Sequence, residues 1–426
     1  MIFKYKRKYM NHISICGIFV IILSSLFYLY DYLLQTSISI FLPIIKVKYM
    51  ITDFQLGLIG AIFFASYVIL QVPIGYLIGK YGARRITSSM AIICFIGGLI
   101  MASGEGFYSL LLSRLILGIG VSGAFLCSIK FIYEWAPNQY FSFFIGILQA
   151  LAGFGAIAGQ APIAFLNNYF SWNNIIYGFA IISFIFFLVF KFLISQDKSV
   201  LSSSQDNMPL LSSMKPLIKD KVILKLAALS FISWAPVASL AGFWIIPFLS
   251  SNGQNNTLVA SYITSSFWIG LILGSILIPL CSEQLKRRLP VLVISFLLQF
   301  LAFLLICTFG STDKYTILLS MFSIGLVAPI QGFCIVVAKD IYPVKQFNII
   351  SGFLNMFATL GGGVLQLVIG FLLSYIFTNN KDAYQLSFVT YSLLALIGLL
   401  ISFYFFKETH PEYNQIKRFN YSLNNL

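Results

Sequence analysis

Long apolar runs separated by short polar breaks extend along almost the whole chain of 426 residues. A run of about 18 or more apolar residues is long enough to cross the hydrocarbon core of a membrane as a helix. The runs lack the short-period alternation of a transmembrane β-barrel, so we expect helices. The twelve expected spans are 13–43, 54–78, 86–104, 107–133, 139–167, 173–195, 223–249, 257–282, 289–310, 315–339, 346–377 and 384–406.

A polar segment after the sixth run divides the chain into two halves. It reads SQDKSVLSSSQDNMPLLSSMKPLIKDK and is rich in Ser, Asp and Lys, the composition of a linker. The sequence therefore predicts an all-α integral membrane protein with twelve transmembrane helices in two halves. Residues 1–195 form one six-helix bundle, 196–222 a cytoplasmic linker, and 223–426 a second six-helix bundle with a short cytoplasmic tail.

The basic residues are distributed unevenly between the two sides that these spans define. Only 9% of the residues are charged, against about 25% in soluble proteins. With the N-terminus in the cytoplasm, 22 of the 27 lysines and arginines fall on the cytoplasmic side, as the positive-inside rule requires. We expect a multi-pass protein of the cytoplasmic (inner) membrane with both termini cytoplasmic. The net charge of +14 follows this topology and does not indicate nucleic-acid binding.

The two halves share a sequence pattern at an offset of 206 residues. The segment GILQALAGFGAIAGQAPIAFLNNY aligns with GFLNMFATLGGGVLQLVIGFLLSY, which matches Gly155 with Gly361 and Gln160 with Gln366. Because six spans separate the copies, equivalent helices run in the same direction. Parallel repeats of this kind place a substrate site near the membrane midplane, between the halves.

The spans contain no recognisable metal, phosphate or nucleophile motif. We therefore expect a transporter and not an enzyme, with no cofactor and no metal site. Two rigid halves that rock about a central site would give alternating access. The expected partners are a small-molecule substrate, protons and the lipid bilayer, and we expect a monomer.

Two short motifs resemble signatures of the major facilitator superfamily. GYLIGKYGARR (75–85) is similar to that superfamily's loop between spans two and three, a glycine-flanked turn followed by basic residues. RLILGIG (114–120) resembles its span-four motif, an arginine followed by spaced glycines. With twelve spans, a central linker and parallel repeats, the resemblance covers the whole chain, and it implies that superfamily's fold and a secondary transporter.

The resemblance also implies a cytoplasmic gate at the loop motif. Its candidate residues are Gly75, Lys80, Gly82, Arg84, Arg85 and Glu134. The loop departs from the superfamily's pattern, because Gly79 stands where an aspartate that helps to lock the gate is usual, and Ala83 takes the first basic position. The remaining basic residues are free to meet carboxylates such as Glu134.

Span five bears on the direction of transport. It keeps the glycine skeleton of the superfamily's antiporter motif at Gly146, Gly155 and Gly159, but Gln160 follows where the motif has its Gly-Pro step. This departure argues against drug efflux. The patterns FASYVILQVPIGYLIGKYGARR and AGQAPIAFL also resemble nutrient carriers of intracellular bacteria, the phagosomal nutrient transporter branch.

Asp31 and Arg114 are charged residues in the interiors of spans one and four. A charge at that depth costs about 2.5–3.5 kcal/mol on insertion scales, so such residues face the bundle interior and have a partner. Ser24, Tyr28, Asp31 and Gln35 are spaced to share one side of a helix, which predicts a polar inward face.

Three roles for Asp31 and Arg114 are compatible with the sequence. They could form a purely structural ion pair. Alternatively, Asp31 is the protonatable coupling site, and a substrate carboxylate that captures Arg114 leaves Asp31 to take up a proton. In the third role, the two residues hold the ammonium and the carboxylate of a zwitterion. The last two roles favour a small substrate that carries a carboxylate, and an amino acid fits best.

Other polar residues extend this candidate site. Gln149 and Gln160 in span five, and Asn355 and Gln366 in span eleven, form two matched pairs, and hydrogen bonding between helices is the alternative explanation. Trp244 lies in a span that prolines interrupt, so it is either a substrate contact or a membrane-interface anchor. The candidate proton-coupling residue is Asp31, and the candidate substrate-binding residues are Arg114, Tyr28, Gln35, Gln149, Gln160, Asn355, Gln366 and Trp244.

The sequence thus favours a secondary active transporter that imports a small polar nutrient, best an amino acid, by proton-coupled alternating access. The alternative is proton-driven efflux of a drug or siderophore-like compound.

Overall fold

The computed structural model describes residues 15–136, 141–193, 217–251, 257–309, 314–342, 344–377, 383–405 and 407–410. By the contacts between its residues, the chain forms two compact units. The first contains Met1–Ser37 and Ala65–Asp206, and the second contains Ile38–Phe64 and Asn207–Leu426. Most of the predicted linker, residues 196–216, lies outside the described residues.

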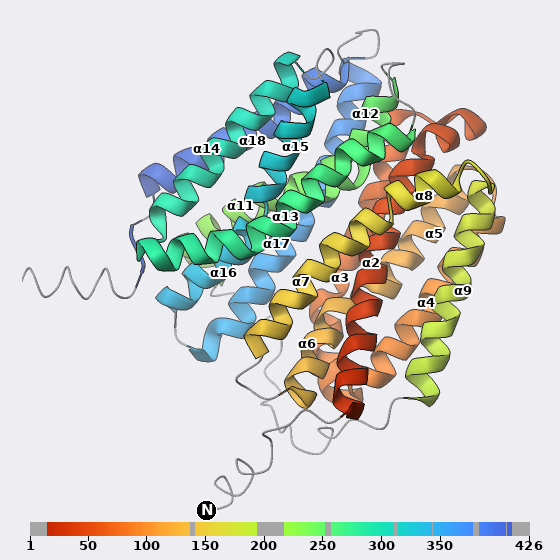
Figure 1. The fold of residues 1–426 in the computed structure, drawn as a ribbon, viewed down its shortest axis with the longest axis horizontal. Coiled ribbons are helices and arrows are strands. Elements are labelled where there is room, and N and C mark those ends of the chain that lie inside the picture. The colour runs from red at the N-terminus through yellow and green to blue at the C-terminus, as the bar shows by residue number, and fades with distance from the viewer. Residues whose placement is uncertain are drawn as a thin grey trace, which may run out of the picture. The chain divides into compact units, whose positions relative to one another are not determined.

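Within the described ranges every regular element is a helix (Figure 1). Twelve are long and apolar enough to cross a membrane, which confirms the predicted spans. The helices of the N-terminal half are α2 (Ile15–Tyr49), α3 (Asp53–Tyr81), α4 (Ala83–Ser103), α5 (Gly106–Val121), α6 (Ala124–Trp135), α7 (Phe141–Ala158), α8 (Ala161–Leu166) and α9 (Trp172–Phe192). Those of the C-terminal half are α11 (Lys221–Ala235), η2 (Pro236–Trp244), α12 (Ile245–Ser251), α13 (Thr257–Leu285), α14 (Leu289–Phe309), α15 (Lys314–Val327), α16 (Ile330–Ile341), α17 (Val344–Phe371), η3 (Leu372–Ile376) and α18 (Ala383–Phe405).

Spans four and ten are interrupted at equivalent positions of the repeat. In span four, α5 ends at Val121 and α6 begins at Ala124. In span ten, α15 ends at Val327 and α16 begins at Ile330, so both boundaries recur after 206 residues. Pro329 precedes α16, and a proline has no backbone N–H to continue a helix. The repeat found in the sequence is therefore also a repeat of helix breaks.

In the first unit, α7 packs closely on α2. A Cβ added at Gly155 would collide with the backbone carbonyl of Leu29, and one added at Gly159 would collide with Thr36 Oγ1. At the same crossing, Thr36 Oγ1 donates to the Ala156 carbonyl at 3.1 Å. Small residues let helix backbones approach closely in membranes, so the glycines predicted as a skeleton fix α7 on the helix that carries Asp31.

The second unit repeats this crossing between α17 and α11. A Cβ added at Gly361 would lie 2.6 Å from the Phe231 carbonyl of α11. Gly361 is the repeat partner of Gly155. Both halves therefore use a glycine at the same position to bring the same pair of helices together.

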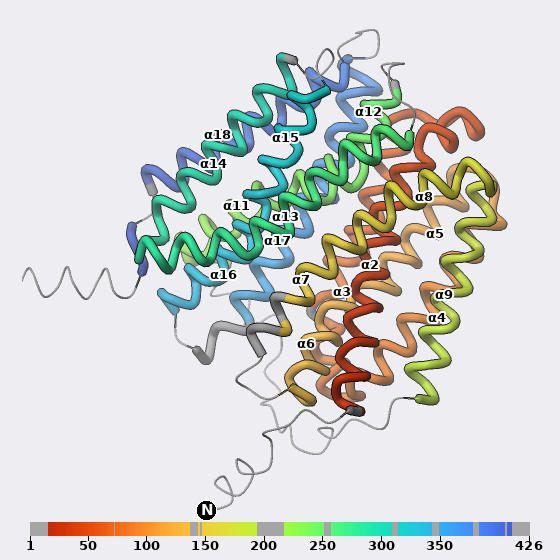
Figure 2. Tube along the Cα trace, viewed as in Figure 1, coloured from red at the N-terminus to blue at the C-terminus, as the bar shows by residue number. Residues whose placement is uncertain are grey.

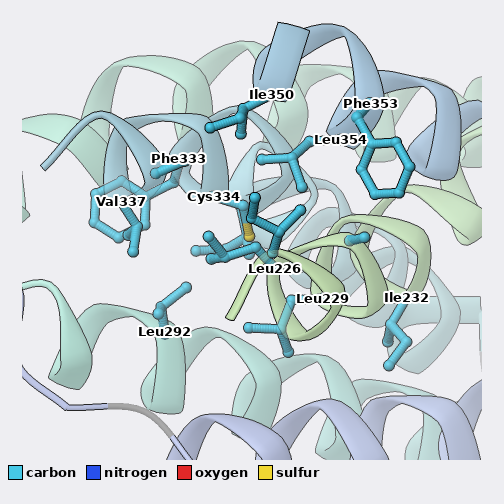
Figure 3. Packing of buried hydrophobic residues seen from close by; sticks show 14 of the residues in the cluster. Leu226, Leu229, Ile232, Leu292, Phe333, Cys334, Val337, Ile350, Phe353 and Leu354 are labelled. Atoms are coloured by element: carbon cyan, nitrogen blue, oxygen red, sulfur yellow. The ribbon is translucent and has the colours of Figure 1, made fainter. Parts of the chain in front are cut away.

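Each unit also has its own apolar core. In the first unit, α4 packs along α5 and α9 (Figure 2), and a Cβ added at Gly98 would lie 3.0 Å from Ala180 Cβ of α9. In the second unit, side chains from α11, α14, α16 and α17 interdigitate (Figure 3). The labelled residues of that cluster are Leu226, Leu229, Ile232, Leu292, Phe333, Cys334, Val337, Ile350, Phe353 and Leu354.

We predict that Gly155→Ala destabilises the protein, because the new methyl group must displace the α2 backbone. Overpacking of this kind costs about 1–3 kcal/mol. The measurement is thermal unfolding of the purified protein in detergent. Gly178→Ala in α9 is the matched control, since a Cβ there meets no atom within 4 Å. Equal melting temperatures for the two variants would contradict the described α2–α7 crossing.

Candidate substrate site and cytoplasmic loop

Asp31 is buried on α2, with a relative exposure of 0%. Gln35, one turn later, donates from Nε2 to Asp31 Oδ1 at 2.8 Å. Among the described residues, Asp31 Oδ2 has no hydrogen-bond partner. The phenol groups of Tyr28, Tyr32 and Tyr67 lie within electrostatic range of this carboxylate. Asp31 is therefore buried among polar side chains of the first unit.

The α2 backbone around Asp31 is held by hydrogen bonds from other helices of the first unit. Ser128 of α6 donates from Oγ to the Ser24 carbonyl at 2.9 Å. Tyr30 donates from its hydroxyl to the Phe179 carbonyl of α9 at 2.7 Å. Together with the close crossing of α7, these contacts leave α2 little freedom to rotate. The carboxylate consequently has a defined direction.

Arg114 lies on α5 and is also buried, with a relative exposure of 1%. Its Nη1 atom donates to the Leu34 carbonyl of α2 at 3.4 Å. Leu34 is one turn from Asp31, so the guanidinium and the carboxylate approach neighbouring turns of the same helix. The ion pairs of the described residues do not include one between Asp31 and Arg114. A direct ion pair is thus not the arrangement found.

The two glutamines of span five lie at different degrees of burial. Gln149 is half-buried on α7. Gln160 is fully buried at the break between α7 and α8, where it precedes the first residue of α8. The break puts Gln160 outside regular helix, with φ −113° and ψ −83°. The predicted pair therefore belongs to one interrupted span, with its second member at the interruption.

Span eleven places its polar residues toward α16 and η2 of the second unit. Asn355 Oδ1 accepts from Gln331 Nε2 of α16 at 3.4 Å. Gln366 Nε2 donates to the Ala238 carbonyl of η2 at 2.8 Å, and Trp244 Nε1 donates to the Gln366 carbonyl at 3.1 Å. Hydrogen bonding between helices, the alternative considered for these residues, is what this structure shows for Gln366.

Trp244 has a relative exposure of 0%. An interface anchor would place its ring at the protein surface. The buried ring instead contacts Phe243 at 5.2 Å and Tyr384 at 6.3 Å between centroids. Of the two interpretations that the sequence left open, the anchor is therefore not the one realised.

The loop motif between α3 and α4 makes a tight turn that ties α4 to α9. Gly82 has φ +85°, a conformation that glycine adopts without steric cost. Arg84 Nε donates to the Phe190 carbonyl at 3.1 Å, and its Nη2 donates to the Lys191 carbonyl. A cationic side chain at the last carbonyls of a helix interacts favourably with the helix dipole. Single-sequence patterns carried no signal for this contact.

The other candidate gate residues lie apart from Arg84's contacts. Gly75, Lys80 and Arg85 are exposed. Glu134 forms an ion pair with Lys130, one turn earlier in α6, at 3.2 Å. The sequence left the basic residues of the loop free to meet carboxylates such as Glu134, and a gating role for these residues stays a prediction.

A cluster that the sequence did not indicate lies at the corresponding loop of the second unit, between α13 and α14. Arg288 Nη1 contacts Glu283 at 2.7 Å, and its Nε contacts Asp340 at 2.9 Å. Although burial alone would lower it, hydrogen bonds to these carboxylates keep the pKa of Arg288 above its ordinary value. Glu408 accepts from the Arg288 backbone N–H at 2.7 Å. The cluster joins α13, α14, α16 and the segment after α18.

Comparison with known proteins assigns relatives to this chain. The sequence model described as Major Facilitator Superfamily matches residues 21–279 and 237–421. An uncharacterized transporter, YybO, of Bacillus subtilis (strain 168) is 23% identical over 408 residues, covering 88% of this chain and 90% of YybO. The sialic acid transporter NanX of Escherichia coli (strain K12) is 23% identical over 385 residues, covering 88% of this chain and 91% of NanX.

A solved structure shows the same fold. The nucleoside transporter NupG, crystallised as a point mutant, superposes with a TM-score of 0.78 at 16% identity. The match covers 92% of this chain and 100% of that structure. The closer likeness to the phagosomal nutrient transporter branch stays a prediction.

We predict that Arg84→Gln lowers the stability of the first unit. The variant loses a charged donor to the carbonyls that end α9, and hydrogen bonds to charged groups contribute about 1.5–3 kcal/mol. Thermal unfolding in detergent measures the effect. The neighbouring Arg85→Gln serves as control, because Arg85 is exposed. If both variants melt alike, Arg84 does not hold α9.

Proposed function

The chain belongs to the Major Facilitator Superfamily and is a membrane transporter of that superfamily, and we propose that it imports a small nutrient bearing a carboxylate, an amino acid, by proton-coupled alternating access. We further propose that it works as a monomer in the cytoplasmic membrane, with both termini in the cytoplasm. The observation that carries the proposal is the burial of Asp31 and Arg114 on neighbouring helices of one unit.

Arg114 is the proposed binding group for the substrate's carboxylate. A guanidinium offers two parallel N–H donors to a carboxylate, which gives both strength and geometric selection. Its Nη1 atom makes a long contact of 3.4 Å with the Leu34 carbonyl, which a substrate oxygen can replace. The relative NanX is a transporter of sialic acid, an acid as its name states, which supports recognition of an anionic group.

Asp31 is the proposed proton-coupling group. Gln35 occupies its Oδ1, and within the described part of the chain its Oδ2 accepts no hydrogen bond. That oxygen is therefore the atom at which a proton would be taken up and released. Burial makes the ionised carboxylate costly, so a change of charge nearby alters its proton occupancy. Binding of an anion at Arg114, which contacts the Leu34 carbonyl one turn along α2 from Asp31, supplies such a change.

In this proposal, binding of the substrate at Arg114 and uptake of a proton at Asp31 are coupled through the charges of the two side chains. A bound carboxylate neutralises the Arg114 charge and makes an ionised Asp31 less favourable. Asp31 then takes up a proton, so the substrate and the proton are bound together, and the loaded site with an amino-acid zwitterion differs from the empty site by the one positive charge of that proton. Release of the substrate on the other side restores the field of Arg114 and favours release of the proton.

The remaining candidate substrate-binding residues differ in whether their polar groups already form hydrogen bonds within the protein. Tyr28 and Gln35 share the α2 face with Asp31, and we propose that they contact the substrate. Gln149, Gln160 and Asn355 are proposed as further polar contacts. In this structure Gln366 and Trp244 are engaged with η2 and α17, so they would reach a substrate only after exchanging those hydrogen bonds.

The direct test is counterflow of labelled amino acids into proteoliposomes that contain the purified protein. We expect accumulation of one chemical group of amino acids, increased by an inward pH gradient. Uptake of none of them, or transport that a pH gradient drives only outward, would reject the import proposal. The second result would favour the alternative, proton-driven efflux of a drug or siderophore-like compound.

We predict that Asp31→Asn abolishes uptake driven by a pH gradient and leaves exchange of substrate intact. Asparagine keeps the size of the side chain but cannot carry a proton across. The measurement compares gradient-driven uptake with counterflow for the same proteoliposome preparation. Full gradient-driven accumulation in this variant would remove Asp31 from the coupling role.

We predict that Arg114→Lys raises the apparent substrate constant by about tenfold or more. An ammonium cannot reproduce a bidentate grip on a carboxylate, and losing one charged hydrogen bond corresponds to about 1.5–3 kcal/mol. Concentration dependence of initial uptake measures it, with Arg287→Lys, an exposed loop arginine, as the control. Unchanged kinetics in Arg114→Lys would indicate a purely structural arginine.

A further inference from the structure

Span seven contains a π-helix, η2, in which all nine residues from Pro236 to Trp244 are buried. A π-helix closes its hydrogen bonds over five residues, and the Ile245 N–H indeed donates to the Leu240 carbonyl. This geometry is rare, and it occurs frequently at functional sites. Pro236 explains where the α-helical pattern stops, since it lacks the N–H that α11 would need. Contacts with other helices must therefore stabilise the wider turns of η2.

One residue of α17 contacts both ends of η2. Gln366 Nε2 donates to the Ala238 carbonyl at 2.8 Å, near the start of the π-helix. The backbone carbonyl of Gln366 accepts from Trp244 Nε1 at 3.1 Å, at its end. Gln366 is 1% exposed, so both contacts are shielded from solvent that would compete for them. Gln366 therefore bridges η2 by two independent hydrogen bonds.

A third element of the same unit covers Gln366. The N-terminal part of α3, Asp53–Phe64, belongs to the second unit by its contacts, and we call it the strap. A Cβ added at Gly57 would lie 2.6 Å from the Gln366 carbonyl. One added at Gly60 would collide with Gln366 Oε1 and would lie 2.9 Å from Phe243 Cε2 of η2. The strap thus touches the bridging residue and the π-helix at once.

The strap is seated on α17 over several turns. A Cβ added at Gly370 would lie 2.6 Å from the Asp53 carbonyl, and one at Gly363 would lie 2.9 Å from Phe64 Cβ. Ser374 Oγ accepts from the Phe54 N–H at 2.7 Å. The strap and α17 are therefore in close contact along this stretch. Packed helices move against each other as rigid pieces. The strap therefore has two states, one packed on α17 along its whole length and one displaced from it.

In the described part of the chain, the side-chain amide of Gln366 uses its nitrogen in a hydrogen bond but not its oxygen. Within the described ranges, Gln366 Oε1 is buried and accepts no hydrogen bond. A buried acceptor without a donor is unfavourable by about 1–3 kcal/mol. The amide therefore keeps this orientation through its bond to Ala238 and through the steric limit that Gly60 and the strap impose. With the strap displaced, the amide is free to rotate and to satisfy its oxygen elsewhere.

We propose that Gln366 couples the seating of the strap to the shape of span seven. With the strap seated, Gln366 holds η2 as a π-helix. With the strap displaced, Gln366 releases Ala238 and the segment shifts toward an α-helix. One residue fewer per π-turn rotates the side chains after that turn by about 100° around the helix, so Trp244 at the end of η2 changes direction. The change concerns the protein alone and does not depend on which substrate is moved.

The test is hydrogen–deuterium exchange of the full-length protein in lipid nanodiscs, read by mass spectrometry on peptides that cover Pro236–Ser251. Gly60→Ala pushes the Gln366 amide aside, and Gln366→Asn withdraws it from Ala238 without adding volume. Both variants should speed exchange in η2 by about tenfold, the effect of losing one buried hydrogen bond. Gly352→Ala on α17 is the matched control, because a Cβ there meets no atom within 4 Å.

A double variant distinguishes an effect of the strap that acts through Gln366 from an independent destabilisation of η2 by each substitution. If the strap acts through Gln366, Gly60→Ala combined with Gln366→Asn exchanges no faster than the faster single variant. Multiplied effects in the double variant would overturn the proposal. So would exchange in Gln366→Asn equal to that of Gly352→Ala, since Asn adds no steric conflict and is expected to fold. Failure of any transport assay leaves this outcome unchanged, because no substrate is used.

Discussion

The constraint on which this structure depends is the cost of burying charge where no water reaches it. A carboxylate or a guanidinium inside a span is unfavourable by about 2.5–3.5 kcal/mol on insertion scales, so it persists where polar partners or a function offset that cost. Asp31 and Arg114 are both buried within the first unit and approach neighbouring turns of α2. In the described part of the chain the two charges contact different groups, Gln35 for Asp31 and the Leu34 carbonyl for Arg114.

Close helix packing sets the position of these charges. In the first unit α7 lies directly on the α2 backbone at Gly155, and Gly361 brings α17 onto α11 in the same way in the second. The helix breaks of spans four and ten also recur at the offset of the repeat. A duplicated packing scheme thus underlies a chain in which the charged residues are not duplicated. We infer that the scaffold is symmetric and that the proposed coupling chemistry belongs to one half.

Much of this architecture could be predicted from the sequence, because length and hydropathy alone determine a membrane span. The spans, the polar face of α2 and the repeat that matches Gly155 with Gly361 follow from patterns in the sequence. The π-helix in span seven, the anchoring of α9 by Arg84 and the grouping of residues 38–64 with the second unit do not. Each of these three features depends on contacts with residues far away in the sequence. An apolar run indicates that a helix is buried, but it does not indicate which other helix packs against it.

The measurement that tests the central claim most directly is infrared difference spectroscopy of the protein in lipid during a pH titration. We expect the wild-type protein to show the band of a carboxyl group that gains and loses a proton. That band should be missing from Asp31→Asn and present in Asp53→Asn, the variant without the carboxylate that pairs with Lys46 at 2.5 Å. An identical difference spectrum for Asp31→Asn and the wild type would show that Asp31 exchanges no proton with water, and the proposed coupling would be wrong.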